Sequence, residues 1–504
     1  MCYLFFLGAF STLSLPPFGF FFINFITFSL LFVFLAKKEK SKNLKSFLYG
    51  WSFGFGYFFS SLYWISISLT FDSDFKFLIP FSLFLIPIFL ALFYGFISLL
   101  FLKINLKNIS SSFFLLVSLF SILEFLRGHI LTGFPWNLIA FSFTNYPNFI
   151  SIISIIGTYS FNIICISLFF LPALLYLKND LKNKFIFGTF LLIVIFFNLY
   201  GNYYSNSFQN SKIIKKDFQI RAIASNFEIQ KFYNDISTEK IIRDLIKISD
   251  PSSTSKKTLF LWPESIIPGV TKDQFKDYNY LFKKNFNHVH QIGLGIISKS
   301  QNDSEKIFNS LAIFDNNLDL LHSYEKINLV PFGEFLPLES ILKRFGLKTL
   351  TNNYKSFSPG KNNNVINLKI QNSYFKILPL ICYEIIYSER IQKIKNYDFI
   401  INISEDGWFG KSIGPKQHFA HSIFRAIENG KYVIRSSNNG MTAIINPIGI
   451  IEKKIDYGQD GYIDFSDSKI IKSTLFSKYG NKIFGFIILL YIFLIFSFNR
   501  FKNE

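Results

Sequence analysis

Three polar residues with complementary chemistry stand at or near the ends of predicted strands. Glu264 follows LFLWP, Lys326 lies in SYEKINLVPFGEFLP, and Cys382 follows YFKILPLI. A cysteine nucleophile needs a base that takes the thiol proton and a cation that stabilises the thiolate and a later oxyanion. Glu264 can act as this proton acceptor and Lys326 as this cation. The three residues therefore predict covalent catalysis by the Cys382 thiol.

Simpler roles for these residues compete with this interpretation. A thiol directly after a buried strand is most often a small core hydrophobe, and the flanking Glu325 is compatible with a surface position for Lys326. The other two cysteines, Cys2 and Cys165, lie in apolar runs, so no disulfide framework or CxxC metal site is available.

The six histidines give no sign of a metal site. The close pairs are His288 with His290 and His418 with His421, and neither has the HExxH spacing. We expect no metal and no histidine beside the three strand ends. Walker A, GxSxG and Rossmann glycine patterns are also absent, so no cofactor is expected.

The elements that position these residues form an α/β domain in the second half of the chain. Helical stretches such as 236–249 and 416–429 alternate with several of the strands, and mixed elements of these lengths predict an α/β domain with a sandwiched sheet. The strands themselves are predicted from short β-branched runs at 218–225, 258–263, 292–297, 310–314, 374–381, 397–403, 431–436 and 441–446.

The chain as a whole is too apolar for a soluble protein of this length. Half of the 504 residues are hydrophobic and 68 are Phe. Most of the apolar runs are long enough to cross a bilayer as helices. We expect about eight spans, near 3–17, 19–36, 47–69, 78–102, 111–127, 149–177, 184–202 and 483–498. The predicted division is a membrane part at 1–203, a catalytic domain at 204–472, and a last span with its tail at 473–504.

The charged loops predict the orientation. Lys and Arg gather in alternate connections, at 37–45, 103–107 and 178–184, and in the tail. The positive-inside rule makes this side cytoplasmic. Both termini are then cytoplasmic, and the catalytic domain lies outside. The net charge of +19 is spread over these loops and the domain without a basic helix or an aromatic RNA-binding motif, so no nucleic-acid partner is expected.

The outer loop 127–137, RGHILTGFPWN, stands out within the membrane part. Glu124 and Arg127 end an apolar run, where ionisable side chains are costly unless they pair or function. The sequence from Gly133 to Trp136 is typical of a re-entrant turn with an aromatic at the membrane interface, although an ordinary aromatic belt would explain Trp136 as well.

Several blocks together resemble a known family. WPES, KINLVPFGEFLP, ICYE and ISEDGWFG resemble the signature blocks of the nitrilase superfamily, whose members use a Glu–Lys–Cys triad. With the spans, LRGHILTGFPW and GPKQHFAHSIFRAIENG, the chain is similar to one membrane branch, the apolipoprotein N-acyltransferases. The resemblance covers almost the whole chain.

This resemblance implies a four-layer αββα sandwich and assigns site residues. It implies a multi-pass α-helical membrane bundle that carries the sandwich, with Glu264, Lys326 and Cys382 as the triad. It assigns supporting roles to Glu334, Tyr383 and Glu384, and lipid or substrate contacts to Trp136, Trp408, Phe409 and Phe232.

Two positions depart from the family pattern. Glu405 replaces a usual Asn, and Phe232 stands where a Trp is usual. Both departures concern residues near the expected lipid contacts, and neither changes the triad.

The implied reaction is lipoprotein maturation in a bacterial inner membrane. The sn-1 acyl chain of a phospholipid passes to Cys382 as a thioester and then to the N-terminal amine of an S-diacylglyceryl-cysteine apolipoprotein, with the domain on the periplasmic side. The partners are the phospholipid donor, the diacylated apolipoprotein acceptor and the bilayer. Two alternatives stay open: a membrane-tethered nitrilase-type amidase acting on a small nitrogen compound, and a transporter with an outer regulatory domain.

Overall fold

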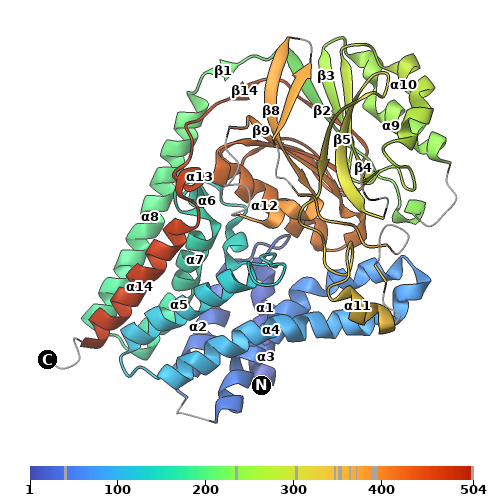
Figure 1. Ribbon diagram of the computed structural model, residues 1–504. Helices are drawn as coiled ribbons and strands as arrows, with labels where there is room; N and C mark the ends of the chain where they lie inside the picture. Colours follow the sequence, from blue (N-terminus) through green and yellow to red (C-terminus); the bar gives the residue numbers. More distant parts are fainter. Residues whose placement is uncertain are drawn as a thin grey trace.

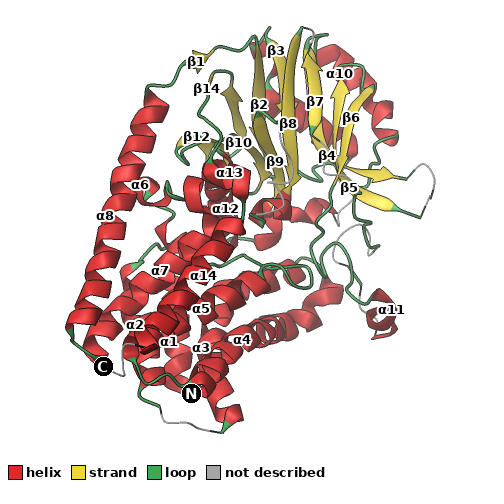
Figure 2. Cartoon of the chain, turned by 60° about the vertical axis from the view of Figure 1, so that its left-hand side comes forward, coloured by secondary structure: helices red, strands yellow, loops and turns green. Residues whose placement is uncertain are grey.

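A computed structural model shows a bundle of apolar helices beneath a sandwich of two sheets (Figure 1). It describes residues 1–38, 42–232, 237–300, 303, 305–345, 348–349, 355–361, 365–370, 372–388 and 396–500. The first residue and the end of α14 lie at the end of the bundle away from the sandwich, in both views (Figures 1 and 2).

Eight apolar helices lie where the sequence places eight segments. They are α1 (Cys2–Ser11), α2 (Phe22–Ala36), α3 (Asn43–Leu62), α4 (Ile79–Ile104), α5 (Ile109–Arg127), α7 (Ile153–Leu177), α8 (Leu181–Gln209) and α14 (Lys482–Arg500). Among the described residues, five stretches are long and apolar enough to cross a membrane, and these contain α4, α5, α7, α8 and α14. The presence of several membrane-compatible helices is thus confirmed, and the count of eight spans stays a prediction.

Glycines explain why α3 is less apolar than its neighbours. A Cβ on Gly50 would lie 2.0 Å from the backbone oxygen of Tyr94 in α4, and one on Gly56 would lie 2.0 Å from the backbone oxygen of Phe5 in α1. Only a residue without a side chain permits such close packing of helix backbones. The small residues of α3 thus serve packing inside the bundle.

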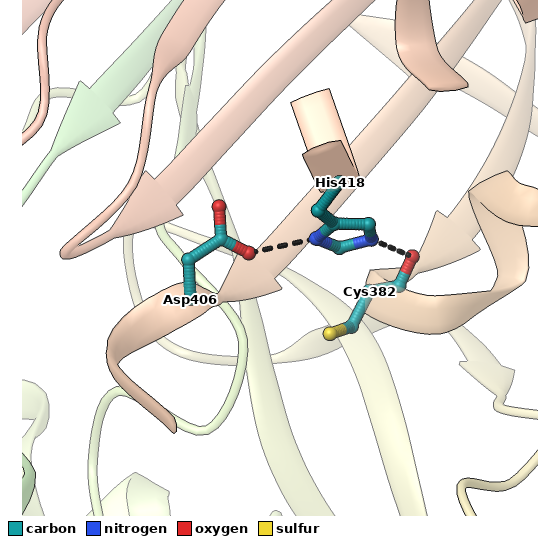
Figure 3. Close-up of side chains that lie close together, drawn as sticks. All are labelled: Cys382, Asp406 and His418. Atoms are coloured by element: carbon teal, nitrogen blue, oxygen red, sulfur yellow. Dashed lines mark hydrogen bonds and ion pairs between the residues drawn. The ribbon is translucent and has the colours of Figure 1, made fainter. Parts of the chain in front are cut away.

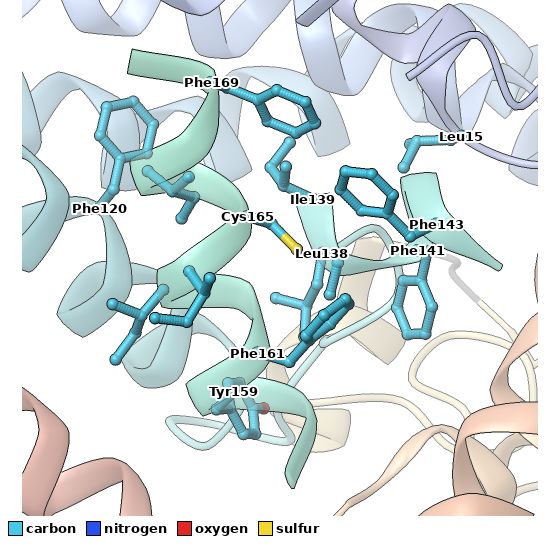
Figure 4. Close-up of a cluster of buried hydrophobic side chains, with 14 of the residues drawn as sticks. Leu15, Phe120, Leu138, Ile139, Phe141, Phe143, Tyr159, Phe161, Cys165 and Phe169 are labelled. Atoms are coloured by element: carbon cyan, nitrogen blue, oxygen red, sulfur yellow. The ribbon is translucent and has the colours of Figure 1, made fainter. Parts of the chain in front are cut away.

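The interior of the bundle is a continuous apolar core. Cys165 of α7 lies in it, with Phe120, Leu138, Phe161 and Phe169 among the surrounding side chains (Figure 4). The thiol is fully buried. This cysteine therefore has the packing role that is common for buried thiols.

Two six-stranded sheets form the sandwich. One has the order β13-β2-β3-β4-β5-β6 and the other the order β12-β11-β10-β9-β8-β7. The first sheet consists of β13 (Gly461–Phe465), β2 (Phe218–Ala224), β3 (Lys257–Leu261), β4 (His290–Lys299), β5 (Ile307–Asp315) and β6 (Leu320–Glu325). The second consists of β12 (Ile451–Ile455), β11 (Thr442–Ile445), β10 (Tyr432–Asn438), β9 (Phe399–Glu405), β8 (Ser373–Ile381) and β7 (Ile366–Ile370). A short pair, β1 (Ile213–Ile214) with β14 (Ser468–Lys469), lies apart from both.

The central strands of each sheet run parallel, and this arrangement brings the candidate site residues to one edge of each sheet. β2, β3 and β4 run parallel in one sheet, and β8, β9 and β10 run parallel in the other. The carboxyl ends of parallel strands meet at one edge of a sheet, where loops can place functional side chains side by side. The loops after β3 and β8 carry Glu264 and Cys382.

Helices cover both outer faces. Inward-facing residues such as Leu259 of β3 and Ile401 of β9 share one core between the sheets. α9 (Thr238–Ser249) and α10 (Asn279–Asn285) cover the first sheet. α12 (Gly414–Asn429) covers the second sheet and also faces the bundle, and its Phe424 lies 4.6 Å from the ring of Phe141 in the membrane part. The expected α/β domain is present, and the outer face of its second sheet shares one apolar core with α12 and the bundle, separate from the core between the sheets.

The buried charges of the outer loop are paired. Arg127 forms an ion pair with Glu124, and both side chains are 1% exposed. Arg127 also donates hydrogen bonds to the backbone oxygen of Phe134 and to Oδ1 of Asn137. The pair therefore fixes the shape of the loop that carries Trp136.

Candidate active site

Cys382 stands at a sharp turn between strand and helix. It follows β8 directly and begins a one-turn 3-10 helix, Cys382–Ile386. Its backbone φ is +48°, a left-handed conformation that is uncommon for a residue other than glycine. Such conformations cost free energy and are often kept at functional sites, where the surroundings hold them in place.

Glu264 and Lys326 meet in a buried network. Lys326 Nζ lies 3.0 Å from Glu264 Oε1 and 2.9 Å from Glu334 Oε1. Asn309 on β5 donates from Nδ2 to the same two carboxylate oxygens, at 2.8 Å each. Two carboxylates thus share one ammonium and one amide, and all four residues are at least 95% buried.

Glu264 is held by backbone groups as well. Glu264 Oε2 accepts a hydrogen bond of 3.0 Å from the backbone N–H of Glu405. Glu264 is also pressed against β4, where a Cβ on Gly295 would lie 2.4 Å from the Glu264 Cα. Both contacts fix which way the carboxylate points.

Lys326 is a permanent cation in this setting. Burial opposes its charge, but Glu264 and Glu334 hold its pKa well above the ordinary lysine value. The side chain is 1% exposed. This excludes the surface position that the flanking Glu325 allowed.

The Cys382 thiol is neutral at rest. Burial raises its pKa well above the ordinary value, and the charge of Glu264 raises it further, while Lys326 opposes both. The residue is 8% exposed. The thiolate form of Cys382 is therefore disfavoured at rest.

Glu384 and Tyr383 tie the turn to its surroundings. Glu384 accepts hydrogen bonds from the backbone N–H groups of Ile381, Ile327 and Asn328, so it joins the loop after β8 to the loop after β6. The Tyr383 hydroxyl donates to the backbone oxygen of Gly133 at 3.2 Å. Glu384 thus holds the loops after β6 and β8 together, and Tyr383 reaches the membrane part.

A second buried cluster, which includes Asp406 and His418, lies against Cys382 (Figure 3). Asp406 Oδ2 lies 2.7 Å from Arg435 Nη2, and Asp406 Oδ1 lies 2.9 Å from Nδ1 of His418. His418 Nε2 lies 3.2 Å from the backbone oxygen of Cys382. The expectation that no histidine lies near the strand ends is therefore wrong, because α12 packs across the end of β8.

The spacing in this cluster merits a test for a metal. One ligand atom each of Cys382, Asp406 and His418 lies within 4.8 Å of the others. However, the Arg435 guanidinium already binds both oxygens of Asp406. A cation there would meet this fixed positive charge at close range, so the donor set does not suit one.

The aromatic residues predicted to contact lipid lie where the sandwich meets the bundle. Trp136 is 2% exposed and its ring lies 4.7 Å from Trp64 and 5.7 Å from Phe409. Trp408 lies 6.2 Å from Phe71, edge to face. The side chain of Phe232 is outside the described residues.

Glu405 has buried partners that suit a carboxylate. Its two oxygens accept from Asn438 Nδ2 at 2.8 and 2.9 Å, and Oε1 also accepts from the backbone N–H of Gly407. Its backbone N–H, the group that holds Glu264, does not depend on the side chain. The presence of Glu at position 405 in place of Asn therefore leaves the hydrogen bond from this N–H to Glu264 in place.

The comparisons with known proteins identify the family. Residues 7–171 match the apolipoprotein N-acyltransferase N-terminal domain, and residues 238–465 match the carbon-nitrogen hydrolase domain. An apolipoprotein N-acyltransferase of Rickettsia typhi is 33% identical over 494 residues, which covers 95% of this chain and 94% of that protein. The chain belongs to the apolipoprotein N-acyltransferase family. A second member, from Rhizobium leguminosarum bv. trifolii, is 30% identical over 91% of this chain and 88% of its own length.

Two solved structures match about half of the chain each. An amidase of Nesterenkonia sp. AN1, solved as a variant with an acetamide moiety covalently added at its active-site cysteine, is 14% identical; the match covers 51% of this chain and 91% of that one, with a TM-score of 0.35. A nitrilase-superfamily protein of Saccharomyces cerevisiae is 19% identical, covering 50% and 90%, with a TM-score of 0.34.

Family membership confirms the resemblance seen in the sequence and supports an acyltransferase. The structure adds residues that sequence reasoning missed: Asn309, Asp406, His418 and Arg435. A signal was available for two of them, since Asp406 lies in the ISEDGWFG block and His418 in GPKQHF. Asn309 and Arg435 lie within strands, where the local pattern predicts only packing.

Proposed function

We propose that this protein transfers the sn-1 acyl chain of a phospholipid to the N-terminal amine of an S-diacylglyceryl-cysteine apolipoprotein. The observation that carries this proposal is the buried pair of carboxylates around Lys326, beside a Cys382 thiol whose turn is hydrogen-bonded to loop 127–137 of the membrane part. The names of the relatives supply the substrate class.

The first half of the cycle loads the enzyme. Glu264 takes the proton from Cys382 Sγ as sulfur attacks the carbonyl carbon of the sn-1 ester. Lys326 and the backbone N–H of Tyr383 stabilise the tetrahedral oxyanion. The carbon–oxygen bond to glycerol then breaks, and protonated Glu264 returns its proton to the departing oxygen. A lysophospholipid leaves, and the acyl chain remains on Cys382 as a thioester.

The second half of the cycle transfers the acyl chain from Cys382 to the acceptor amine. The neutral α-amine of the diacylated cysteine attacks the thioester carbonyl, and Glu264 accepts a proton from the nitrogen. The same two donors stabilise the second oxyanion. The carbon–sulfur bond breaks, the proton returns to sulfur, and the product carries an amide. Division of one transfer into two steps is the purpose of a covalent nucleophile.

The charge arrangement suits this sequence of steps. Lys326 remains cationic throughout because its pKa is held well above the ordinary value. Glu334 keeps this cation in place while Glu264 changes its protonation state, because Glu334 binds both Lys326 and Asn309. In this proposal Glu334 and Glu384 hold the site together and do not exchange protons.

The membrane part suits lipid-anchored substrates. We place the division at 1–203, 204–472 and 473–504, with about eight spans, both termini in the cytoplasm and the domain on the periplasmic side of the inner membrane. Trp136, Trp408, Phe409 and Phe232 are the proposed lipid contacts. Phe409 packs on Trp136 and Trp64, and Trp408 packs on Phe71, in the region between sandwich and bundle where an acyl chain would enter.

The acyl acceptor separates this proposal from a membrane-tethered amidase. The purified protein is incubated in phospholipid vesicles with a diacylglyceryl-cysteine peptide, and with the same peptide N-acetylated. We expect acylation of the free-amine peptide only, matched by release of lysophospholipid. Hydrolysis of small amides with no acylated peptide would favour the amidase. Cys382→Ser is the control and should abolish transfer while the protein still folds.

The orientation has its own test. A cysteine at exposed Asn317, in the sandwich, and one at exposed Lys107, in a bundle loop, are compared in intact cells after the outer membrane is made permeable. A thiol reagent that cannot cross the inner membrane should label Asn317→Cys at once and Lys107→Cys only after lysis. The reverse order would overturn the proposed topology. A transporter would instead show solute flux that Cys382→Ser leaves intact.

A further inference from the structure

His418 is wedged between the nucleophile, a buried ion pair and the membrane loop. Its Nε2 lies 3.2 Å from the Cys382 backbone oxygen. Its other nitrogen lies 2.9 Å from Asp406 Oδ1 and 3.1 Å from Arg435 Nη2. Its ring stacks on Trp136, with 5.3 Å between centroids and 20° between planes. Every one of these side chains is more than 90% buried.

The contacts indicate where the ring proton lies. Nδ1 faces one acceptor and one donor, whereas the recorded partner of Nε2 is a carbonyl oxygen, which can only accept. A single ring proton can serve only one of the two oxygens that face the ring, Asp406 Oδ1 and the Cys382 carbonyl oxygen. Asp406 Oδ1 also accepts from Ser404 Oγ at 2.6 Å and from Arg435 Nη2 at 3.0 Å, so it keeps two donors when Nδ1 carries no proton, and Arg435 can donate to Nδ1. A proton on Nε2 therefore leaves both oxygens with a donor. Nε2 therefore points at the backbone of the nucleophile and is engaged there.

The backbone conformation of Cys382 is unfavourable and must be stabilised by its surroundings. Its φ of +48° is unfavourable for a residue with a side chain. The direction of the Cα–Cβ bond, and with it the position of Sγ, follows from this backbone conformation. We propose that His418 is a positioning residue: its Nε2–H fixes the Cys382 carbonyl, and Trp136 of the membrane loop and the Asp406–Arg435 pair fix His418. The inference rests on the proposed role of Cys382.

Loop 127–137 also contacts the Cys382–Ile386 turn directly. The hydroxyls of Tyr383 and Tyr387 both donate to the backbone oxygen of Gly133. Trp136 Nε1 donates to Gln417 Oε1 at 2.9 Å, next to His418 on α12. Loop 127–137 thus touches the nucleophile turn directly and through His418. The membrane part is, on this view, a component of the catalytic geometry in addition to an anchor.

Two substitutions of His418 separate its nitrogens. In His418→Gln the amide nitrogen falls near the place of Nε2 and keeps a donor for Cys382, while in His418→Asn it falls near Nδ1 and that donor is lost. The rate of acyl-Cys382 formation from a phospholipid is measured by intact mass on detergent-purified protein, per folded molecule. His290→Asn is the control, because His290 is equally buried but packs on Phe260 and Phe286, away from the site.

We expect His418→Gln within about fivefold of wild type and His418→Asn slowed on the order of 10- to 100-fold, as for a misplaced reacting group. The KM for phospholipid should be unchanged in both, and His290→Asn should acylate at the wild-type rate. Equal rates for Asn and wild type, or equal losses for Gln and Asn, would overturn the positioning role.

Either His418 variant decides the matter alone if the other fails to fold. A large loss in His418→Gln would mean that the imidazole itself is needed, which contradicts the proposal. If neither folds, the position of the ring proton in the wild-type protein, read from the nitrogen chemical shifts of His418, decides: a proton on Nδ1 only would overturn it. Absence of any adduct on Cys382 in the wild-type protein would instead refute the proposed function.

Discussion

Two buried charge clusters flank Cys382, and they differ in balance. On one side Glu264 and Glu334 share a single cation, Lys326. On the other side Asp406 faces the cation Arg435, with His418 between Asp406 and the nucleophile. The first cluster thus has one carboxylate more than it has cations, whereas the second pairs one carboxylate with one guanidinium. Both clusters are buried, so the balance of charges, and not burial, is what distinguishes them.

The pKa directions agree with this contrast. Burial alone would raise the pKa of Asp406, but Arg435 and then His418 hold it well below the ordinary value. Lys326 is shifted the other way, well above its ordinary value, although burial opposes its charge. The first cluster therefore retains a buried cation, and the second retains a buried ion pair beside the turn at Cys382.

Removal of the excess carboxylate should have the largest effect. Glu264→Gln keeps the shape and the contact to the Glu405 N–H but removes the base, so acyl transfer should fall roughly 10²–10⁴-fold. At the same time the Cys382 pKa should fall, because the Glu264 charge raises it. The pH dependence of Cys382 alkylation by iodoacetamide measures this, with peptide mapping to exclude Cys2 and Cys165. A variant that transfers acyl groups normally would end the assignment of the base.

Removal of the cation should act in the opposite direction on the thiol. Lys326→Met should lower acyl transfer by roughly 10²–10³-fold, and it should raise the Cys382 pKa, so alkylation near neutral pH slows. The two buried carboxylates lose their partner, so unfolding should become easier by about 3–5 kcal/mol. If Lys326→Met and Glu264→Gln shifted the alkylation profile the same way, the electrostatic account of the first cluster would be wrong.

A change in the balanced cluster should mainly affect stability. Asp406→Asn leaves Arg435 without a counter-charge, at a cost of about 3–5 kcal/mol. Because the folded pKa of Asp406 is depressed, its contribution is fully present above the unfolded value of about 3.9 and is lost progressively as the pH falls from there toward the much lower folded pKa. Thermal unfolding from pH 7 down to about 2 should show a difference between variant and wild type that is constant above about pH 4 and narrows below it. A constant difference across this range would contradict the ion-pair role.

Restoration of the family's usual residue should have the smallest effect. Glu405→Asn removes one carboxylate from the surroundings of Asn438 but keeps the backbone N–H that holds Glu264. Acyl transfer should change by less than about tenfold, the factor that one hydrogen bond of about 1.4 kcal/mol supplies. A much larger loss in the peptide acylation assay would show that Glu405 acts together with the cluster of Glu264, Glu334 and Lys326.

The sequence predicts much of this arrangement because its physics is local. Apolar runs of bilayer length read as helices, and strand ends at Glu264 and Cys382 place two functional groups at one edge of parallel sheets. The contacts that sequence reasoning missed are long-range. Asn309 bonds a residue 45 positions away, and Trp136 bonds one 281 positions away on α12. Nothing in the local pattern of a strand or a loop encodes such a partner.

In the proposed function, the acyl chain is carried on Cys382 between donor and acceptor. The direct measurement is peptide mass spectrometry of the wild-type protein after incubation with a phospholipid that carries one defined sn-1 chain, without acceptor. We predict one acyl adduct on the peptide that contains Cys382, cleaved by hydroxylamine and transferred to a diacylglyceryl-cysteine peptide when that is added. Acylation of the acceptor with no adduct on Cys382, or with the adduct on another residue, would contradict the account.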